Sequence, residues 1–123
     1  MTSPRPAVTI DDPPTMSLLG LILASILERN LADPARQRAA ARLRGDVVVQ
    51  AGEMIVTLTF AEGGVTVRRG AAERPRAAVR GSLDTLMGLS LGRGMVGPVL
   101  AGRLKPRGSL LQLLRIRRLL RVE

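Results

Sequence analysis

The feature that most constrains the fold is the way glycine divides the last third of the chain. Between Arg80 and Val122 the sequence reads as short apolar segments separated by glycines. Ser82 can cap a helix over 83–91, which Gly92 ends, because a serine oxygen accepts from the first free N–H groups and glycine adopts the left-handed conformation that closes a helix. A short strand at 103–105 and a leucine- and arginine-rich helix at 109–122 follow.

The middle of the chain carries strand patterns. Residues 47–50 are rich in valine, and Met54, Val56, Leu58 and Phe60 alternate with less apolar residues, as in a half-buried strand. Residues 65–68 and 77–80 are two further short strands, and glycine turns follow the first two strands. These short connections predict an antiparallel meander of four strands. With 103–105, the chain is expected to be an α+β protein with a mostly antiparallel five-stranded sheet and helices over one face.

The N-terminal third divides into an arm and two helices. Four prolines oppose helix in residues 1–14, which predicts a disordered arm ahead of a single domain over 15–123. Asp11 and Asp12 stand where a secretion signal carries positive charge, so we expect a cytoplasmic protein. Residues 16–27 form an apolar helix, too short for the roughly 20 residues that span a membrane. An alanine- and arginine-rich helix is expected at 35–44.

The absence of two residue types excludes several kinds of chemistry. The chain has no Cys and no His, so disulfides, thiolate nucleophiles and zinc–cysteine sites are excluded, and the commonest general base is missing. The carboxylates are scattered, with no pair spaced for one helix face or a metal loop. We therefore expect no enzymatic activity, no catalytic residues, no cofactor and no metal.

A glycine motif spans residues 92–97, which read G-R-G-M-V-G. In a dinucleotide site such glycines follow a parallel strand and open a helix, so that backbone N–H groups reach a pyrophosphate. Here a helix precedes the motif and no strand–helix–strand unit surrounds it. The motif is better explained as a hinge before a short helical turn at 95–101.

The positive charge leaves two interpretations of the last helix open. The net charge is +9, which favours an anionic membrane or nucleic acid as partner. On a helical wheel, one arc of the last helix is apolar: Leu113, Ile116, Leu119 and Leu120. The other side is basic: Arg115, Arg117, Arg118 and Arg121. The helix is either a core helix with a solvated basic face, or a lid over an apolar cavity whose arginines contact anionic lipid.

Nucleic acid is not expected as a partner. Single-strand binding folds stack bases on aromatic side chains. The only aromatic residue is Phe60, which the strand pattern assigns to the core.

The span from Gly45 to Val122 resembles the sterol carrier protein type 2 family. The similarity is carried by the two-strand unit at 47–60, the helix S-L-D-T-L-M-G-L from Ser82, and the segment L-A-G-R-L-K from Leu100 that leads to Gly108 and a leucine-rich helix. These are apolar and glycine positions rather than catalytic signatures. Pro106 and Ser109 depart from the family pattern, where an aliphatic residue and an aspartate are common.

The resemblance implies an apolar cavity between the sheet and its helices. Members are associated with sterols, fatty acyl chains or isoprenoid precursors, so the expected function is non-enzymatic binding and carriage or presentation of such a ligand. Side chains expected to line the cavity are Val56, Leu58, Phe60, Leu86, Met87, Met95, Val99, Leu113 and Leu114. The alternative is an accessory subunit that presents a hydrophobic intermediate to a partner enzyme, with the arm and residues 35–44 as contact surfaces.

Overall fold

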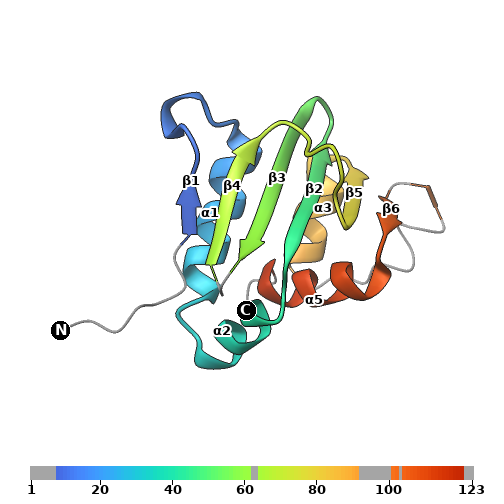
Figure 1. Cartoon of the computed structure of the whole chain (residues 1–123). Helices are drawn as coiled ribbons and strands as arrows, with labels where there is room; N and C mark the ends of the chain where they lie inside the picture. The colour runs from blue at the N-terminus through green and yellow to red at the C-terminus, as the bar shows by residue number, and fades with distance from the viewer. Residues whose placement is uncertain (1–7, 62–63, 92–100, 103, 121–123) are drawn as a thin grey trace.

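The fold is a six-stranded mixed sheet covered by helices on one face (Figure 1). The computed structural model describes residues 8–61, 64–91, 101–102 and 104–120. Along the sheet the strands lie in the order β1-β4-β3-β2-β5-β6. Their bounds are β1 Val8–Ile10, β2 Gly45–Ala51, β3 Met54–Ala61, β4 Gly64–Arg69, β5 Ala77–Gly81 and β6 Leu104–Gly108.

The expectation of a mostly antiparallel five-stranded sheet is wrong in strand number and in two pairings. Strands β2, β3 and β4 form the expected antiparallel meander, but β5 pairs with β2 in parallel. This follows from the connection at 70–76, which carries the chain from β4 past β3 to the far side of β2. Thr57 holds that connection, since its hydroxyl donates to the carbonyl of Gly70 (2.7 Å) and accepts from the amide of Ala72 (3.0 Å).

The sixth strand comes from residues expected to be disordered. Val8–Ile10 pair in parallel with Val65–Val67 of β4, and the amide of Asp11 donates to the carbonyl of Val67 (2.9 Å). The prolines of the arm flank this segment rather than interrupt it, and its β-branched residues suit a strand. The predicted disordered arm was too long, because a strand of three residues gives too short a pattern to recognise. Residues 1–7 lie outside the described part.

Pro106 has no backbone N–H to donate to a neighbouring strand. It lies inside β6, which is an edge strand paired antiparallel with β5. An edge strand tolerates proline because half of its backbone groups face away from the sheet.

Alternation along β3 separates the two faces of the sheet. Val56, Leu58 and Phe60 are at most 2% exposed and belong to the hydrophobic core, against which Met54 also packs. Ile55, Thr57 and Thr59 alternate with them and face the opposite side. The expectation that one face of this strand is core is confirmed.

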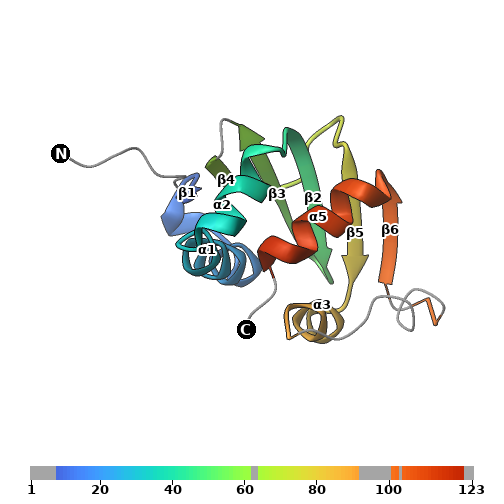
Figure 2. The ribbon, with the colours of Figure 1, turned by 90° about the horizontal axis from the view of Figure 1, so that it is seen from below.

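Helices α1 (Leu18–Asn30), α3 (Leu83–Ser90) and α5 (Leu110–Leu120) cover the apolar face (Figure 2). Ser17 caps α1 by accepting from the amide of Gly20 at 3.3 Å, and Ser82 accepts from the amide of Thr85 at 3.1 Å. Helix α2 (Pro34–Ala41) is shorter than expected and packs beside α5. The predicted glycine hinge at 92–97 lies outside the described residues, as does most of the helical turn predicted at 95–101.

Two glycines with left-handed backbone provide a matched test of the sheet edge. Gly52 (φ 61°) occupies the two-residue β2–β3 turn, with open space around a hypothetical Cβ. Gly108 (φ 77°) ends β6, where a Cβ would collide with the carbonyl of Arg76. We predict that Gly52→Ala lowers the free energy of unfolding by about 1–2 kcal/mol. Gly108→Ala should lower this free energy by about 1–3 kcal/mol more than Gly52→Ala does, because overpacking against the carbonyl of Arg76 adds to the backbone strain.

Urea unfolding of both variants checks this prediction. Equal losses of unfolding free energy in the two variants would show that β5 and β6 can shift to accommodate a Cβ at residue 108 without further cost.

Candidate functional site: an apolar pocket between the sheet and its helices

A small apolar pocket lies where three helices meet the sheet. Its volume is about 60 Å³. Strands β2 and β5 form one wall, and the other sides come from α1, α3 and α5. The lining residues are Leu19, Leu23, Val47, Val49, Val79, Leu86, Met87, Leu113, Ile116, Arg117 and Leu120.

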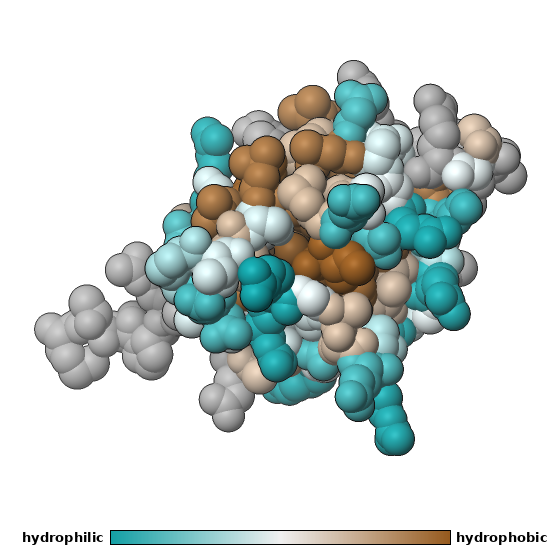
Figure 3. Space-filling view, turned by 90° about the horizontal axis from the view of Figure 1, so that it is seen from above, coloured by the Kyte–Doolittle hydropathy of each residue, from teal (hydrophilic) through white to brown (hydrophobic). Residues whose placement is uncertain are grey.

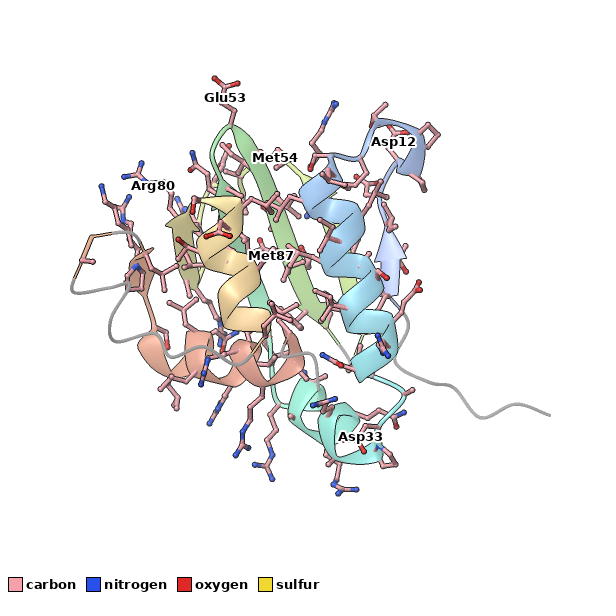
Figure 4. The ribbon with its side chains drawn as sticks, turned by 180° about the vertical axis from the view of Figure 1, so that it is seen from behind. Asp12, Asp33, Glu53, Met54, Arg80 and Met87 are labelled. Carbon is pink, nitrogen blue, oxygen red and sulfur yellow. The ribbon has the colours of Figure 1, made fainter. Side chains whose placement is uncertain are left out.

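Simple periodicities bring these side chains together. Val47 and Val49 are two residues apart on β2, so both face the helices. Leu19 and Leu23 are one turn apart on α1. Figure 4, from behind, shows α3 and α1 in front of the sheet, with Met87 on the side of α3 toward α1.

Three of the residues expected to line a cavity lie at this pocket: Leu86, Met87 and Leu113. Val56, Leu58 and Phe60 are buried on the same face of the sheet but do not line the pocket. Leu114 does not face it either, because its side chain is 53% exposed. Met95 and Val99 lie outside the described residues.

Sequence analysis missed the contributions of β2, β5 and α1. In the run Val47-Val48-Val49 apolar residues do not alternate with polar ones. The pattern therefore does not show which of these side chains face the helices. Helix α1 is apolar on most faces, and the same ambiguity applied to Leu19 and Leu23. A usable signal was the pairing of β2 with β3, because Val47 lies opposite Leu58 and Val49 opposite Val56. Residues directly opposite each other share a face.

The basic side of the last helix is divided between solvent and pocket. Arg115 and Arg118 are exposed, as expected. Arg117 was assigned to the same solvent-facing side but instead lines the pocket, with its Nε atom buried. It stands four residues after Leu113 and three before Leu120, at the margin of the buried arc. Its aliphatic stem can therefore lie along apolar surface. Arg121 lies outside the described residues.

Two buried amides hold α5 against α1 and against the segment that follows α2. Asn30 at the end of α1 donates to the carbonyl of Leu119 and accepts from the guanidinium of Arg36 at 3.1 Å. Gln112 donates to the carbonyl of Arg44 at 3.2 Å. Both amides are buried, so each hydrogen bond replaces water that the site excludes. These contacts fix the helix that supplies Leu113, Ile116, Arg117 and Leu120 to the pocket.

The described residues show neither a metal cluster nor a membrane-spanning helix. Within this part of the chain, no three His, Cys, Asp or Glu side chains come together as metal ligands. No helix there combines the length and apolarity needed to cross a bilayer. The pocket is lined by aliphatic side chains, one methionine and one arginine, and none of them is a nucleophile or a carboxylate. Such a lining suits binding of apolar groups.

Comparison with known families identifies the fold. The model of the SCP-2 sterol transfer family matches residues 23–121. The chain belongs to this family. The match includes the C-terminal half of α1 and all the other lining elements of the pocket. No curated protein matches the sequence.

Several solved structures share the architecture at low identity. A structure described as "UbiJ-SCP2 Ubiquinone synthesis protein" is 21% identical, with a TM-score of 0.68, over 89% of this chain and 90% of that one. The sterol carrier protein domain 2 of Helicoverpa armigera is 17% identical, with a TM-score of 0.63, over 94% and 98%. The sec-alkylsulfatase Pisa1 from Pseudomonas is 18% identical, with a TM-score of 0.63, over 71% of this chain but 14% of the enzyme. At these identities the likeness shows the fold.

The buried amide of Asn30 provides a test of how α5 is held. Replacing Asn30 with Ala removes the donor to the Leu119 carbonyl in a buried place. We predict a loss of about 1–3 kcal/mol in the free energy of unfolding, because a buried group loses its partner. The control is Gln50→Ala, which removes an exposed hydrogen bond to the carbonyl of Gly52 and should cost less than about 0.5 kcal/mol. Chemical denaturation measures both, and similar losses would show that the Asn30 contact contributes little.

Proposed function

We propose that this protein binds a hydrophobic ligand between its sheet and helices and carries or presents it without catalysing a reaction. The observation that supports this most directly is the pocket lining, in which ten of the eleven side chains are apolar. Ligand pockets are mostly apolar, with a few polar groups that fix orientation. Membership of a sterol transfer family supports the same general activity.

The size of the pocket implies that its walls separate when a ligand enters. Its volume of about 60 Å³ is far below the roughly 300–1,000 Å³ typical of ligand pockets. Helices α1 and α3 line opposite parts of the pocket but make few close backbone contacts with each other. Displacing α3 would therefore disrupt little helix packing. Met87 suits such a wall because its flexible side chain adapts to different shapes.

The elongated ligands associated with the family, a fatty acyl or isoprenoid chain or a sterol, remain the proposed classes. A larger hollow of about 430 Å³ lies on the opposite face of the sheet, where Arg80, Lys105 and Arg107 join apolar side chains in its lining. These three cationic side chains make it a less suitable place for an apolar chain.

A second candidate function is that of an accessory subunit. The similarity to a structure named as a ubiquinone synthesis protein favours it, because that name refers to the synthesis of a hydrophobic compound rather than to its transfer. The Pisa1 structure also shows this fold as part of a larger enzyme chain. Under this proposal the protein presents a hydrophobic intermediate to a partner. Transfer of a labelled lipid between vesicles by the purified protein alone would favour the carrier over the subunit.

Filling the pocket tests the proposed binding site. Val79→Phe places an aromatic ring in the cavity, whereas Ile55→Phe makes a similar change on the opposite face of the sheet. We predict that Val79→Phe keeps the fold and weakens binding of a fluorescent fatty acid by about tenfold or more, since excluding two methylenes costs about 1.6 kcal/mol. Ile55→Phe should bind as the wild type does. Fluorescence titration measures both affinities, and circular dichroism checks the fold.

Unchanged binding in a folded Val79→Phe variant would place the ligand elsewhere. Failure of the wild-type protein to bind any acyl, sterol or isoprenoid probe would contradict the carrier function itself.

We also propose that the exposed side of α5 contacts anionic membrane. Leu111, Leu114, Arg115 and Arg118 follow one another at helical spacing, and Leu111 and Leu114 are 59% and 53% exposed. Leucines beside arginines on one face are typical of helices that lie in a membrane interface. Figure 4 shows nitrogen-tipped side chains projecting from α5 and neighbouring α2 along one end of the molecule. Exposed arginines of α2 and the residues after it add charge there: Arg38, Arg42 and Arg44.

A charge-matched pair of variants tests this contact. Replacing Arg115 and Arg118 with Gln should lower the affinity for anionic vesicles, measured by co-sedimentation, more than tenfold. The reason is that each Arg near the surface contributes about 1 kcal/mol of attraction. Replacing Arg68 and Arg74 with Gln makes the same change in net charge away from α5 and should have little effect. High salt should reduce wild-type binding. Equal losses in the two variants would show that net charge alone governs binding.

A further inference from the structure

The face of the sheet opposite the apolar pocket has no helix over its middle. This face is toward the viewer in Figure 1, since the view from behind in Figure 4 has α1 and α3 in front of the sheet. The connection at 70–76 passes along this face, anchored by the two hydrogen bonds of the Thr57 hydroxyl. Together with β2, β5 and β6, this connection lines the hollow of about 430 Å³ described above.

Two further hollows extend this one along β5. A hollow of about 470 Å³ at the start of β5 shares Pro75, Ala78 and Arg107 with it. Another of about 420 Å³ at the end of β5 shares Arg80 and Lys105. The three hollows together are called the β5–β6 groove below. The groove follows the five residues of β5, or about 17 Å at the usual rise of a strand. This length suits a short extended peptide better than a single compact ion.

Strand register sets cationic side chains beside an apolar floor in the groove. Arg107 lies opposite Ala78, and Lys105 lies opposite Arg80. Val48 of β2 lies opposite Ala78 on the other side. Residues directly opposite each other share a face of the sheet. The groove therefore has small apolar side chains in its middle and cationic side chains toward β6.

Positive charge is in excess along the groove. Figure 3 shows hydrophilic side chains gathered on the right, the side on which β5 and β6 lie in Figure 1. The described residues that line the groove include one acidic side chain, Glu73, and four exposed cationic ones: Arg74, Arg80, Lys105 and Arg107. Asp46 on the same face already accepts a hydrogen bond from the Thr59 hydroxyl at 2.7 Å. A surface of this kind is complementary to an acidic partner.

Protection of the sheet edge accounts for only part of this charge. Lys105 and Pro106 suit an edge strand, because a charge and a missing N–H discourage another chain from adding to the sheet. Arg80, however, lies on β5, which has a neighbouring strand on both sides. Arg74 precedes β5 in the connection. A partner is therefore expected to lie across the face and to be bound by side chains, rather than to pair with the free edge of β6.

This sequence does not itself supply an acidic occupant. Outside the described ranges it contains two carboxylate side chains, Glu62 and Glu123, which are far apart in the chain. A second copy of the chain would bring the same net charge of +9 to the contact. Like charges brought together at an interface oppose association. Charge complementarity therefore points to a different protein.

We propose that the β5–β6 groove binds an extended acidic segment of a partner protein. The carboxylates of this segment pair with the cationic side chains of the groove, and an apolar side chain of the segment packs against Val48 and Ala78. The groove and the apolar pocket lie on opposite faces of the sheet, so a docked partner leaves the pocket uncovered. The inference stands independently of lipid binding and gives the accessory-subunit function a docking surface.

The probe for this surface is a fluorescein-labelled peptide with the sequence E-E-L-E-E-L-E-E, compared with the same peptide carrying Gln in place of every Glu. Fluorescence anisotropy measures both affinities in about 0.15 M salt, where exposed charges more than about 8 Å apart are largely screened. The wild-type protein should bind the acidic peptide at least about tenfold more tightly than the neutral one, because only the acidic peptide complements the charge of the groove.

Two charge-reversal variants assign the binding to the groove. Arg80→Glu combined with Arg107→Glu should weaken acidic-peptide binding at least about tenfold, because like charges then face each other. Arg29→Glu combined with Arg68→Glu makes the same change in net charge at exposed positions outside the groove. Arg68 lies on β4, four strand spacings from β6, or about 19 Å, so this variant should keep its affinity within about twofold. Circular dichroism checks that both variants are folded.

Several results would overturn the inference while leaving the proposed lipid-binding function standing. Equal affinity for the two peptides, or equal losses in the two variants, would show that the groove does not recognise the acidic segment. A labelled single-stranded oligonucleotide that binds more tightly than the peptide, and is lost in the groove variant, would identify nucleic acid as the occupant. Loss of vesicle sedimentation in the groove variant would identify a lipid surface. A dimer that only the groove variant abolishes in sedimentation velocity would identify a second copy.

Discussion

The structure depends on covering one apolar face of a twisted sheet with helices that do not close completely over it. Val47 and Val49 on β2 and Val56, Leu58 and Phe60 on β3 make this face aliphatic almost throughout. It must be removed from water, because burial of apolar surface is the dominant favourable term in folding. Helices α1 and α3 cover it and α5 crosses at one end, with few close backbone contacts between α1 and α3. The pocket lies in the space that this arrangement leaves.

The small volume of the pocket and its apolar lining have the same physical origin. Apolar side chains from two strands and three helices fill most of the space between sheet and helices around the pocket, since protein interiors pack densely. Only about 60 Å³ remains open. A lipid that entered would therefore replace some contacts between protein side chains with contacts to its own chain. The apolar surface area removed from water would change little.

Helix α5 combines three environments within eleven residues. Its apolar arc packs on the sheet, Asn30 holds it to α1 and Gln112 holds it to the segment after α2. Leu111, Leu114, Arg115 and Arg118 face outward. Arg117 lies at the margin between the pocket and the outer side. Sequence analysis located the helix and its apolar arc, because these depend on a period of 3.6 residues. It placed Leu114 in the cavity and Arg117 in solvent. A residue at the border of an apolar arc faces inward or outward depending on which elements pack beside the helix, and the sequence does not show that packing.

The sequence by itself determined most of the secondary structure, β1 excepted, and which face of β3 is buried. Alternation, caps and terminal glycines are local signals, so the β2–β3–β4 meander and helices over 16–27, 35–44, 83–91 and 109–122 could be predicted from neighbouring residues. Tertiary structure alone decided the parallel pairing of β5 with β2 and of β1 with β4, because strand order depends on where a crossing connection docks. It also selected Leu19, Leu23, Val47 and Val49 as pocket residues. Their segments are apolar on most sides, and only the docking of other elements determines which side faces the pocket.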